Sequence, residues 1–459
     1  MRRRFLNIEK GIDINNYLTI EALEDNLTAC LSINTCEYCI DGDGSWIQIS
    51  SMTETQSINK GQTLSFRGFL IPYEWQGIGT FTVNKNFNLK GNVMSILFGD
   101  AGKDNYSLSG KNCVFYKLFY NCTTLKSVSA NFLPATTLED YCYASMFQNC
   151  SSLTTVPALP ATTVVDSCYS NMFQDCTSLT TAPELPATTL TSNCYSSMFE
   201  GCSKLTTAPA LPATTLAAYC YSSMFEGCSK LTTAPALPAT TLVSSCYQGM
   251  FCGCKALTIA PELPATILET LCYSMMFSGC TNLINAPELP ATILKSYCYD
   301  GMFNGCSNLN HIKMLATNIP ASSCLNTWVY GVASTGTFVK NPNMTSLPTA
   351  KDYNYYAGIP SGWTVVNDGE ESGVSGKIVN HGVMTISKTL KSFNAKIVFE
   401  FPCASTISIN VITSLVPAIY GVSEGNAYVQ FSGVGEFQSF TFTPTEDDTY
   451  IYEIEVKIE

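Results

Sequence analysis

The chain has 459 residues, roughly three times the usual length of one domain, so several domains or a repeat array are expected. Its net charge of -12 argues against binding nucleic acid through the phosphates, because that binding needs a basic surface. With only two histidines, His311 and His381, neither a serine–histidine triad nor a multi-histidine metal site is expected.

The first residues are basic but lack the pattern of an export signal. Residues 2–4 are arginines, and the following stretch is interrupted by Asn7, Glu9 and Lys10 before any apolar core can form. We therefore expect no signal peptide. No apolar run elsewhere approaches the roughly 18 residues that a membrane span requires, so no membrane span is expected.

Residues 1–113 are predicted to form a sandwich-like β domain that also covers the first repeat. Short alternating segments separated by turn signals indicate strands at 28–33, 46–50, 63–69 and 79–83. Cys36 and Cys39 form a lone C-x-x-C pair, which lacks the second pair of a zinc site and therefore indicates a plain strand. Asp41 and Asp43 indicate a turn, because a calcium loop would need a later bidentate glutamate.

A repeat of 26 residues dominates the middle of the chain. Seven units occupy 142–323, with a partial unit before them and a half-unit after them. A fixed period of this length is typical of a solenoid, propeller or array. Each unit contains two cysteines, which form one series at 142, 168, 194, 220, 246, 272 and 298 and a second at 150, 176, 202, 228, 254, 280 and 306.

The residue pattern inside a unit predicts one short helix and one short strand. Tyr143, Met146, Phe147 and Cys150 are spaced as on one face of a helix. Residues 205–208 then suggest an extended segment that stops at a proline, and this proline recurs in six units. Because proline has no N–H to donate, the ladder between units must be short or broken there. One strand and one helical turn fit a horseshoe-type solenoid, whereas a propeller blade needs four strands and about 40 residues.

The unit M-F-x-G-C-x-x-L-T-T-A-P-x-L-P-A-T-T-L resembles the BspA-type leucine-rich repeats, whose core reads A-F-x-x-C-x-x-L-x-x-I-x-L-P. The segment 336–365 is also similar to the closing cap of such arrays. The resemblance covers 114–365 and implies a leucine-rich-repeat solenoid with a C-terminal cap. The family includes adhesins of the surface of gut anaerobes, so the resemblance also implies an adhesion role.

The chain after the cap is predicted to contain a linker and a second β-sandwich. Residues 366–376 are polar and rich in glycine. Strand patterns return over 377–459, at 383–388, 396–401, 406–411, 428–431, 438–443 and 450–458. The expected fold is therefore mixed β/α, a leucine-rich-repeat solenoid of short strands and short helices flanked by two all-β domains.

The cysteine columns of the repeats are expected to be buried free thiols. Two cysteines eight residues apart on one helix would be about 12 Å apart, beyond disulfide reach. Cysteine is also a small and readily buried hydrophobic residue. Some disulfides between units, or a metal ladder, remain alternatives that the sequence does not exclude.

The columns expected to face solvent give the candidate interaction face. They combine the threonine pairs with the residue between Ala-Pro and Leu-Pro, which is glutamate in some units. Hydroxyls and carboxylates on an open repeat face could contact glycans or proteins, although an ordinary soluble surface would have the same composition. The candidate residues are Thr180, Thr181, Glu184, Thr206, Thr207, Thr232, Thr233, Glu262 and Glu288.

The sequence favours a structural or adhesion role over catalysis. It offers no nucleophile–base pair, phosphate loop or carboxylate pair, so we expect no enzyme and no cofactor. An adhesin-like array without an export signal suggests a phage virion appendage, such as a fibre or decoration protein. The alternatives are a cell-surface adhesin and a cytoplasmic scaffold. The expected partners are other virion or surface proteins, a host glycan or protein, and further copies of the chain, but no nucleic acid.

Overall fold

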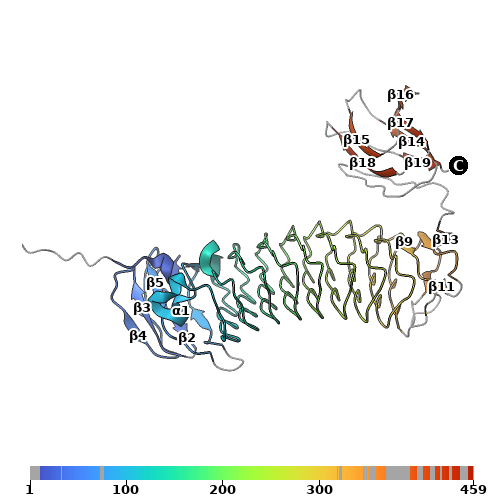
Figure 1. Cartoon of the computed structure of the whole chain (residues 1–459). Coiled ribbons are helices and arrows are strands. Elements are labelled where there is room, and N and C mark those ends of the chain that lie inside the picture. The colour runs from blue at the N-terminus through green and yellow to red at the C-terminus, as the bar shows by residue number, and fades with distance from the viewer. Residues whose placement is uncertain are drawn as a thin grey trace, which may run out of the picture. The chain divides into compact units, whose positions relative to one another are not determined.

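The computed structural model describes residues 11–32, 34–72, 77–317, 319, 323–344, 347, 349–350 and 358–368, together with the backbone of six strands between 393 and 457. The chain divides into two compact units, Met1–Val365 and Val366–Glu459 (Figure 1). The first unit contains the repeats, which form successive coils of 26 residues stacked one behind the next. The described regular elements are mostly strands with few helices.

Two sheets precede the coils in the first unit. The larger has the strand order β4-β3-β5-β1-β7-β8, and the smaller pairs β2 with β6. A short helical segment, α1 with η2, follows β7. The bounds are η1 (Ile14–Asn16), β1 (Leu18–Ala22), β2 (Ala29–Leu31), β3 (Cys36–Ile40), β4 (Ile47–Ile49), β5 (Thr63–Arg67), β6 (Phe81–Val83), β7 (Phe87–Lys90), α1 (Ser95–Phe98), η2 (Gly99–Asp104), β8 (Leu125–Val128) and η3 (Ala130–Phe132).

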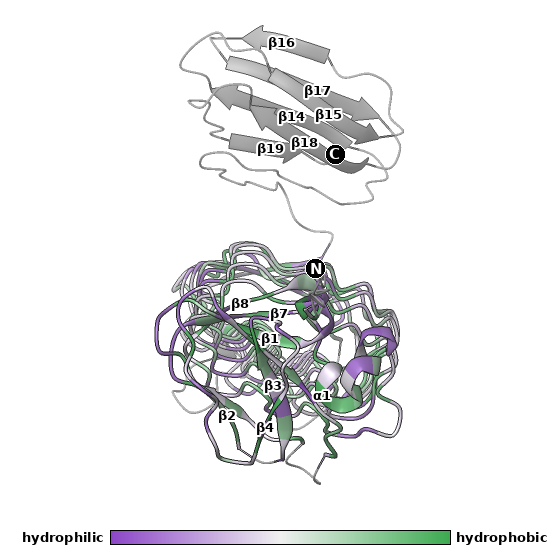
Figure 2. Cartoon of the chain, turned by 90° about the vertical axis from the view of Figure 1, so that its left-hand side faces the viewer, coloured by the Kyte–Doolittle hydropathy of each residue, from purple (hydrophilic) through white to green (hydrophobic). Residues whose placement is uncertain are grey.

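The larger sheet continues directly into the stack of coils. β7 pairs with β8 in parallel, and β8 lies in the partial first repeat. The rings of Phe81 and Phe119 stack across the same junction with centroids 5.4 Å apart. Figure 2 looks onto this end, where β1, β3, β7 and β8 lie across the coils. The N-terminal strands therefore cover the apolar end of the array and share its core.

The sequence prediction of a short helix in each repeat is wrong. Residues 141–150 form overlapping reverse turns, in which Met146 N–H donates to Tyr143 O and Cys150 N–H donates to Phe147 O. The intervening N–H groups donate instead to the next coil, as Phe147 N–H does to Met172 O at 3.0 Å. Turns that advance four residues at a time bring residues i and i+4 to one side, so their side-chain spacing imitates that of a helix.

A left-handed residue at every fourth position produces these turns. In the coil of Cys220 the positions are Tyr219, Ser223 and Gly227, with φ of 58°, 52° and 72°. Such φ values are costly for most residues and free for glycine, which explains the glycine before the second cysteine in most repeats. A Cβ at Gly227 would lie 3.6 Å from the preceding Gly201 Cα, so the backbone angle rather than space selects glycine here.

Prolines limit pairing on the side of the coils opposite the reverse turns. We call this side, which is residues 206–215 in the coil of Cys194, the proline side, and the side of the reverse turns the turn side. Single β-bridges join Thr181 to Thr207 and Thr207 to Thr233, and pairing stops before Pro209. Where the proline column ends, strands β9 (His311–Met314) and β10 (Thr337–Lys340) pair over four residues, and β13 (Thr364–Asn367) joins them. A second row of single bridges lies beyond the prolines, where Thr189 pairs with Thr215 and Thr241 pairs with Ile267. The missing N–H of proline is therefore what limits the ladder to isolated bridges.

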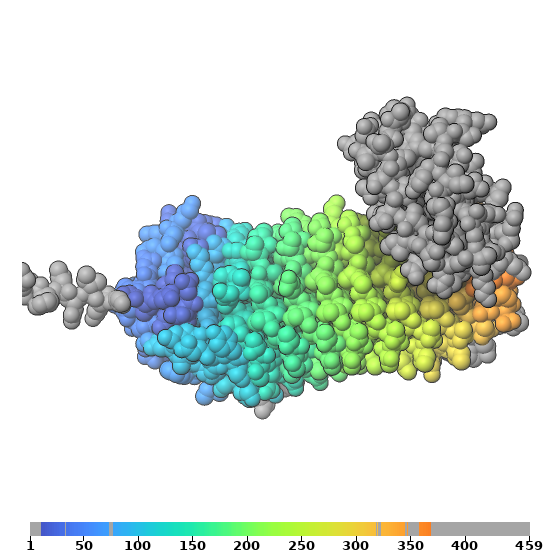
Figure 3. Space-filling model, turned by 45° about the horizontal axis from the view of Figure 1, so that its top comes forward, coloured from blue at the N-terminus to red at the C-terminus, as the bar shows by residue number. Residues whose placement is uncertain are grey.

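The core of the stack consists of columns of identical side chains. Tyrosine rings from Tyr143 to Tyr299 stack with centroids 5.8–6.2 Å apart. A parallel column from Phe119 to Phe303 stacks at 5.7–5.9 Å. The accompanying leucines, methionines and cysteines are buried as well. In Figure 3 the coils form one continuous surface around this interior.

Two tryptophans close the array after the last repeat. Trp328 Nε1 donates to Gly358 O at 3.0 Å, and Trp363 Nε1 donates to Ala333 O at 2.8 Å. Trp328 lies against Phe303, the last ring of the phenylalanine column. A small pair of strands, β11 (Thr349–Ala350) and β12 (Ile359–Pro360), lies in the same segment.

The second unit contains six described strands in two sheets. The orders are β16-β17-β14-β19 and β15-β18, with antiparallel neighbours throughout. Residues 366 and 367 of the expected linker belong to β13, and 369–376 and the expected strand at 383–388 lie outside the described residues. The bounds are β14 (Phe393–Glu400), β15 (Ile407–Thr413), β16 (Ile419–Ser423), β17 (Asn426–Gly433), β18 (Phe437–Pro444) and β19 (Glu453–Lys457).

The columns predict that interior and exterior substitutions differ sharply in cost. Phe225→Ala removes a fully buried ring that stacks on both neighbours, so it should lower the free energy of unfolding by roughly 3–5 kcal/mol. Thr206→Ala changes an exposed side chain in the preceding coil, so it should lower the free energy of unfolding by less than about 0.5 kcal/mol. Urea unfolding of both variants measures the difference, and equal costs would contradict this assignment of the two faces.

Candidate functional site

All nine residues of the candidate interaction face are exposed and lie on the proline side of the coils. The threonines project from the stretch that precedes the proline column, and the glutamates lie just after it. Backbone bridges align Thr181, Thr207 and Thr233 in one row, one residue per coil. The structure therefore brings the predicted hydroxyls together as a row on successive coils.

The hydroxyl row changes character toward the C-terminal coils. The bridges that join Thr207 to Thr233 continue to Ile259, Asn285 and His311. Ile259 is 70% exposed, so an apolar side chain follows the threonines in the same row. The threonines of this row are thus confined to the earlier coils, and an exposed isoleucine, an asparagine and a histidine follow them.

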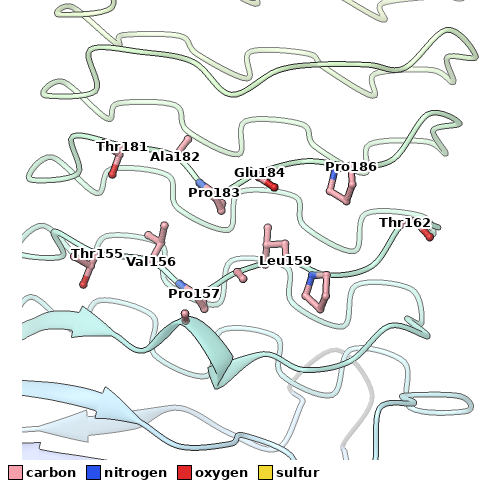
Figure 4. A pocket seen from close by; sticks show the side chains of 13 residues that line it. Thr155, Val156, Pro157, Leu159, Thr162, Thr181, Ala182, Pro183, Glu184 and Pro186 are labelled. Carbon is pink, nitrogen blue, oxygen red and sulfur yellow. The ribbon is translucent and has the colours of Figure 1, made fainter.

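The three glutamates of the face have different surroundings. Glu288 Oε2 lies 3.3 Å from Lys313 Nζ, so this carboxylate is already paired with a lysine of β9. Glu262 projects from its coil as an exposed side chain. Glu184 lies at the edge of a groove between two coils (Figure 4). The sequence could not distinguish these settings, because all three residues occupy the same repeat position.

The groove coincides with an interruption in the row of bridges. Ser127 is bridged to Thr155, and Thr181 is bridged to Thr207, but no bridge joins Thr155 to Thr181 in the described chain. Nor does any backbone hydrogen bond link described residues 152–165 to 178–191. The two coils are held together by the turn side and the core, and their proline sides are left unpaired.

The groove has a volume of about 670 Å³ and a mostly apolar lining, within the usual size range of ligand sites. Figure 4 shows Val156, Pro157 and Leu159 in one row, with Pro183 and Glu184 in the row beside it. Sequence analysis missed this groove. The available signal was Val156, which replaces the alanine that the later units have before their first proline.

The cysteine columns lie in the core as free thiols. The second cysteine of each repeat donates its S–H to a phenylalanine carbonyl of the preceding coil, as Cys228 Sγ does to Phe199 O at 3.1 Å. Burial raises the pKa of the Cys228 thiol from 9.0 to about 12. A neutral buried thiol is neither a nucleophile nor a good metal ligand, so these columns contribute packing rather than chemistry.

A half-buried polar column lies on the turn side of the coils. Burial raises the pKa of Glu200, with a further increase from the neighbouring Glu226. Cys252 occupies the same column one coil beyond Glu226, and burial together with that carboxylate raises its pKa to about 11. Cys252 and Cys30 are the two partly exposed cysteines of the part of the chain that the structure describes.

The sequence predicts neither a metal site nor a membrane span. Among the described residues, no three histidine, cysteine, aspartate or glutamate side chains come together as metal ligands. Within the same residues, every helix is too short or too polar to span a bilayer. The C-x-x-C pair lies in β3, with Cys36 and Cys39 both buried.

Thiol labelling checks the state of the cysteine columns. In the native protein Cys252 and Cys30 should react first with a maleimide, because the other described thiols are buried. After denaturation without reductant, nearly all 22 cysteines should react. Disulfides between neighbouring repeats could pair at most six of the seven cysteines in each column, which leaves about ten thiols, so labelling near or below that number by mass spectrometry would contradict free thiols.

Comparison with known families supports the repeat assignment. A family model described as the BspA type leucine rich repeat region matches in six copies, over residues 112–258 and 221–333. Neither the curated proteins nor the solved structures give a match. The matched segment spans the stacked coils, including their turn side, threonine rows and proline column. With its repeat unit, its stacked coils and this match in agreement, the chain is a BspA-type leucine-rich-repeat protein.

Proposed function

We propose that this protein is a non-enzymatic adhesion protein that presents the proline side of its coils to a partner. Leucine-rich repeats of this type indicate a protein-interaction or adhesion role. The observation that carries the proposal is the row of exposed hydroxyls, Thr181, Thr207 and Thr233, aligned on a rigid backbone. Pre-aligned side chains lose little conformational entropy on binding, which favours an extended recognition surface.

The non-enzymatic part of the proposal is supported by the state of the strongest nucleophiles. The cysteines are the side chains best suited to covalent catalysis, and those of the two repeat columns are buried in the core with raised pKa values. The pKa of the partly exposed Cys252 is also raised, to about 11. The polar groups of the face are mainly threonine hydroxyls, which need an adjacent base to react. A binding role needs no such base, because the threonine hydroxyls can donate and accept hydrogen bonds directly.

Loss of adhesion after a change confined to the face tests the role. Thr207→Arg with Thr233→Arg places bulky cations on the proposed face, whereas Thr215→Arg with Thr241→Arg places the same charges at another exposed corner of neighbouring coils. With the fluorescently labelled full chain on host cells, the first pair should lower binding by at least about tenfold, and the second pair should leave binding nearly unchanged. Equal effects of the two pairs, or none, would contradict this face.

The finer form of the proposal assigns the protein to a phage virion, as a fibre or decoration protein that attaches to a host glycan or protein. Rigid stacked coils, covered at one end by the N-terminal sheets and at the other by the tryptophan segment, suit a projecting appendage. The resemblance to surface adhesins favours a second candidate, an adhesin of the cell envelope.

Fractionation distinguishes the two locations. Mass spectrometry of gradient-purified virions should recover peptides of this chain at a constant ratio to a capsid protein, and washed envelope fractions of uninfected cells should lack them. The reverse distribution would support the envelope adhesin and contradict the virion assignment. Deleting residues 1–113 would be a poor test, because β7 pairs with β8 and the deletion would expose the core.

A further inference from the structure

We infer that the groove between the coils of Thr155 and Thr181 binds a polypeptide segment that carries a basic residue beside aliphatic ones. The inference rests on the proposed adhesion role and specifies the partner at one place on the face. Two properties of the groove support it: an apolar lining without aromatic rings, and a single carboxylate.

The described backbone beside the groove pairs with the coils on either side and not across the groove. Thr154 N–H donates to Lys126 O, and Thr206 N–H donates to Thr180 O at the long distance of 3.5 Å. The corresponding bond between Thr180 N–H and Thr154 O is missing from the described hydrogen bonds. The hydrogen bond between Thr258 N–H and Thr232 O is missing from them as well, so an open backbone pair is not peculiar to the groove, and the side chains of the groove select its partner.

The lining favours aliphatic side chains over sugars. Most of the lining residues are alanine, valine, leucine or proline, and the lining contains no aromatic ring. Ala158, Pro160 and Pro186 are its exposed apolar side chains, whereas Pro157, Leu159 and Pro183 lie buried at its base. A sugar ring would therefore find no flat partner on which to stack. Valine, leucine or proline side chains of a peptide would cover this apolar surface and exclude water from it, which is favourable.

Charge selects a basic residue in the partner. Glu184 is the one ionisable side chain among the residues that line the groove, and the chain as a whole carries a net charge of -12. An acidic segment would be repelled by both, whereas a lysine or arginine can pair with Glu184 across the groove. The equivalent positions in the next two coils are Ala210 and Ala236, so the carboxylate and the groove occur together here.

The test is selection of a displayed library of random octapeptides on the full-length protein. The enriched peptides should share one lysine or arginine flanked by aliphatic residues. Ala158→Trp fills the groove from an exposed position and should abolish enrichment, while Ala236→Trp, at the equivalent exposed position outside the groove, should preserve it. Both variants should match the wild type in thermal unfolding, because both side chains face solvent.

Fluorescence anisotropy of one enriched peptide then tests the ion pair. Glu184→Gln should weaken binding about threefold to fivefold, as for a partly exposed pair, and Glu262→Gln should leave it unchanged. A peptide with glutamine in place of its basic residue should bind the wild type and Glu184→Gln equally, which isolates the pair in a double-mutant cycle.

Several results would overturn the inference. These are no enrichment above the Ala158→Trp variant, enrichment of peptides without a basic residue, and equal effects of Glu184→Gln and Glu262→Gln. Binding to a glycan array that Ala158→Trp abolishes, without peptide binding, would assign the groove to a sugar instead. If host-cell adhesion persists while the peptide test fails, only the groove assignment falls; if adhesion also fails, the proposed function falls with it.

Discussion

Each coil of this protein is held by hydrogen bonds that its backbone cannot make within itself. On the turn side, half of the N–H groups close reverse turns and the other half donate to the next coil. A coil is therefore complete only when its neighbour is present, and the 26-residue period must be strict for the donors to meet their acceptors. The same period places each tyrosine, phenylalanine and cysteine against the equivalent residue of the next coil, so the core packs as columns.

The proline column makes the backbone pairing differ between the two sides of the coils. On the turn side, pairing is continuous and the backbone is fixed. On the proline side, pairing is reduced to isolated bridges, because proline cannot donate. Where the column ends, ordinary strands form at β8 and β9. A side that is weakly paired but rigidly supported can present exposed side chains and, between Thr155 and Thr181, open a groove without weakening the core.

Burial decides the chemistry of the cysteines. A series of cysteines at fixed spacing could in principle form a redox or metal ladder, but desolvation raises the pKa values in both columns. The S–H groups of the second column also donate to phenylalanine carbonyls. The S–H bond also gives a reason for cysteine over alanine or serine at this position. Cysteine is small enough for the column, apolar enough for the core, and able to donate a weak hydrogen bond to a carbonyl.

The sequence alone determined the period, the family, the buried columns and the exposed rows, because these follow from residue type at fixed spacing. It could not distinguish helix from successive turns, since Tyr143, Met146, Phe147 and Cys150 share the same spacing in both; only the left-handed φ of every fourth residue separates them. Nor could it separate Glu184, Glu262 and Glu288. Their settings depend on which coil lies opposite, on Lys313 of β9 and on one missing bridge, and these are tertiary relations that no single repeat encodes.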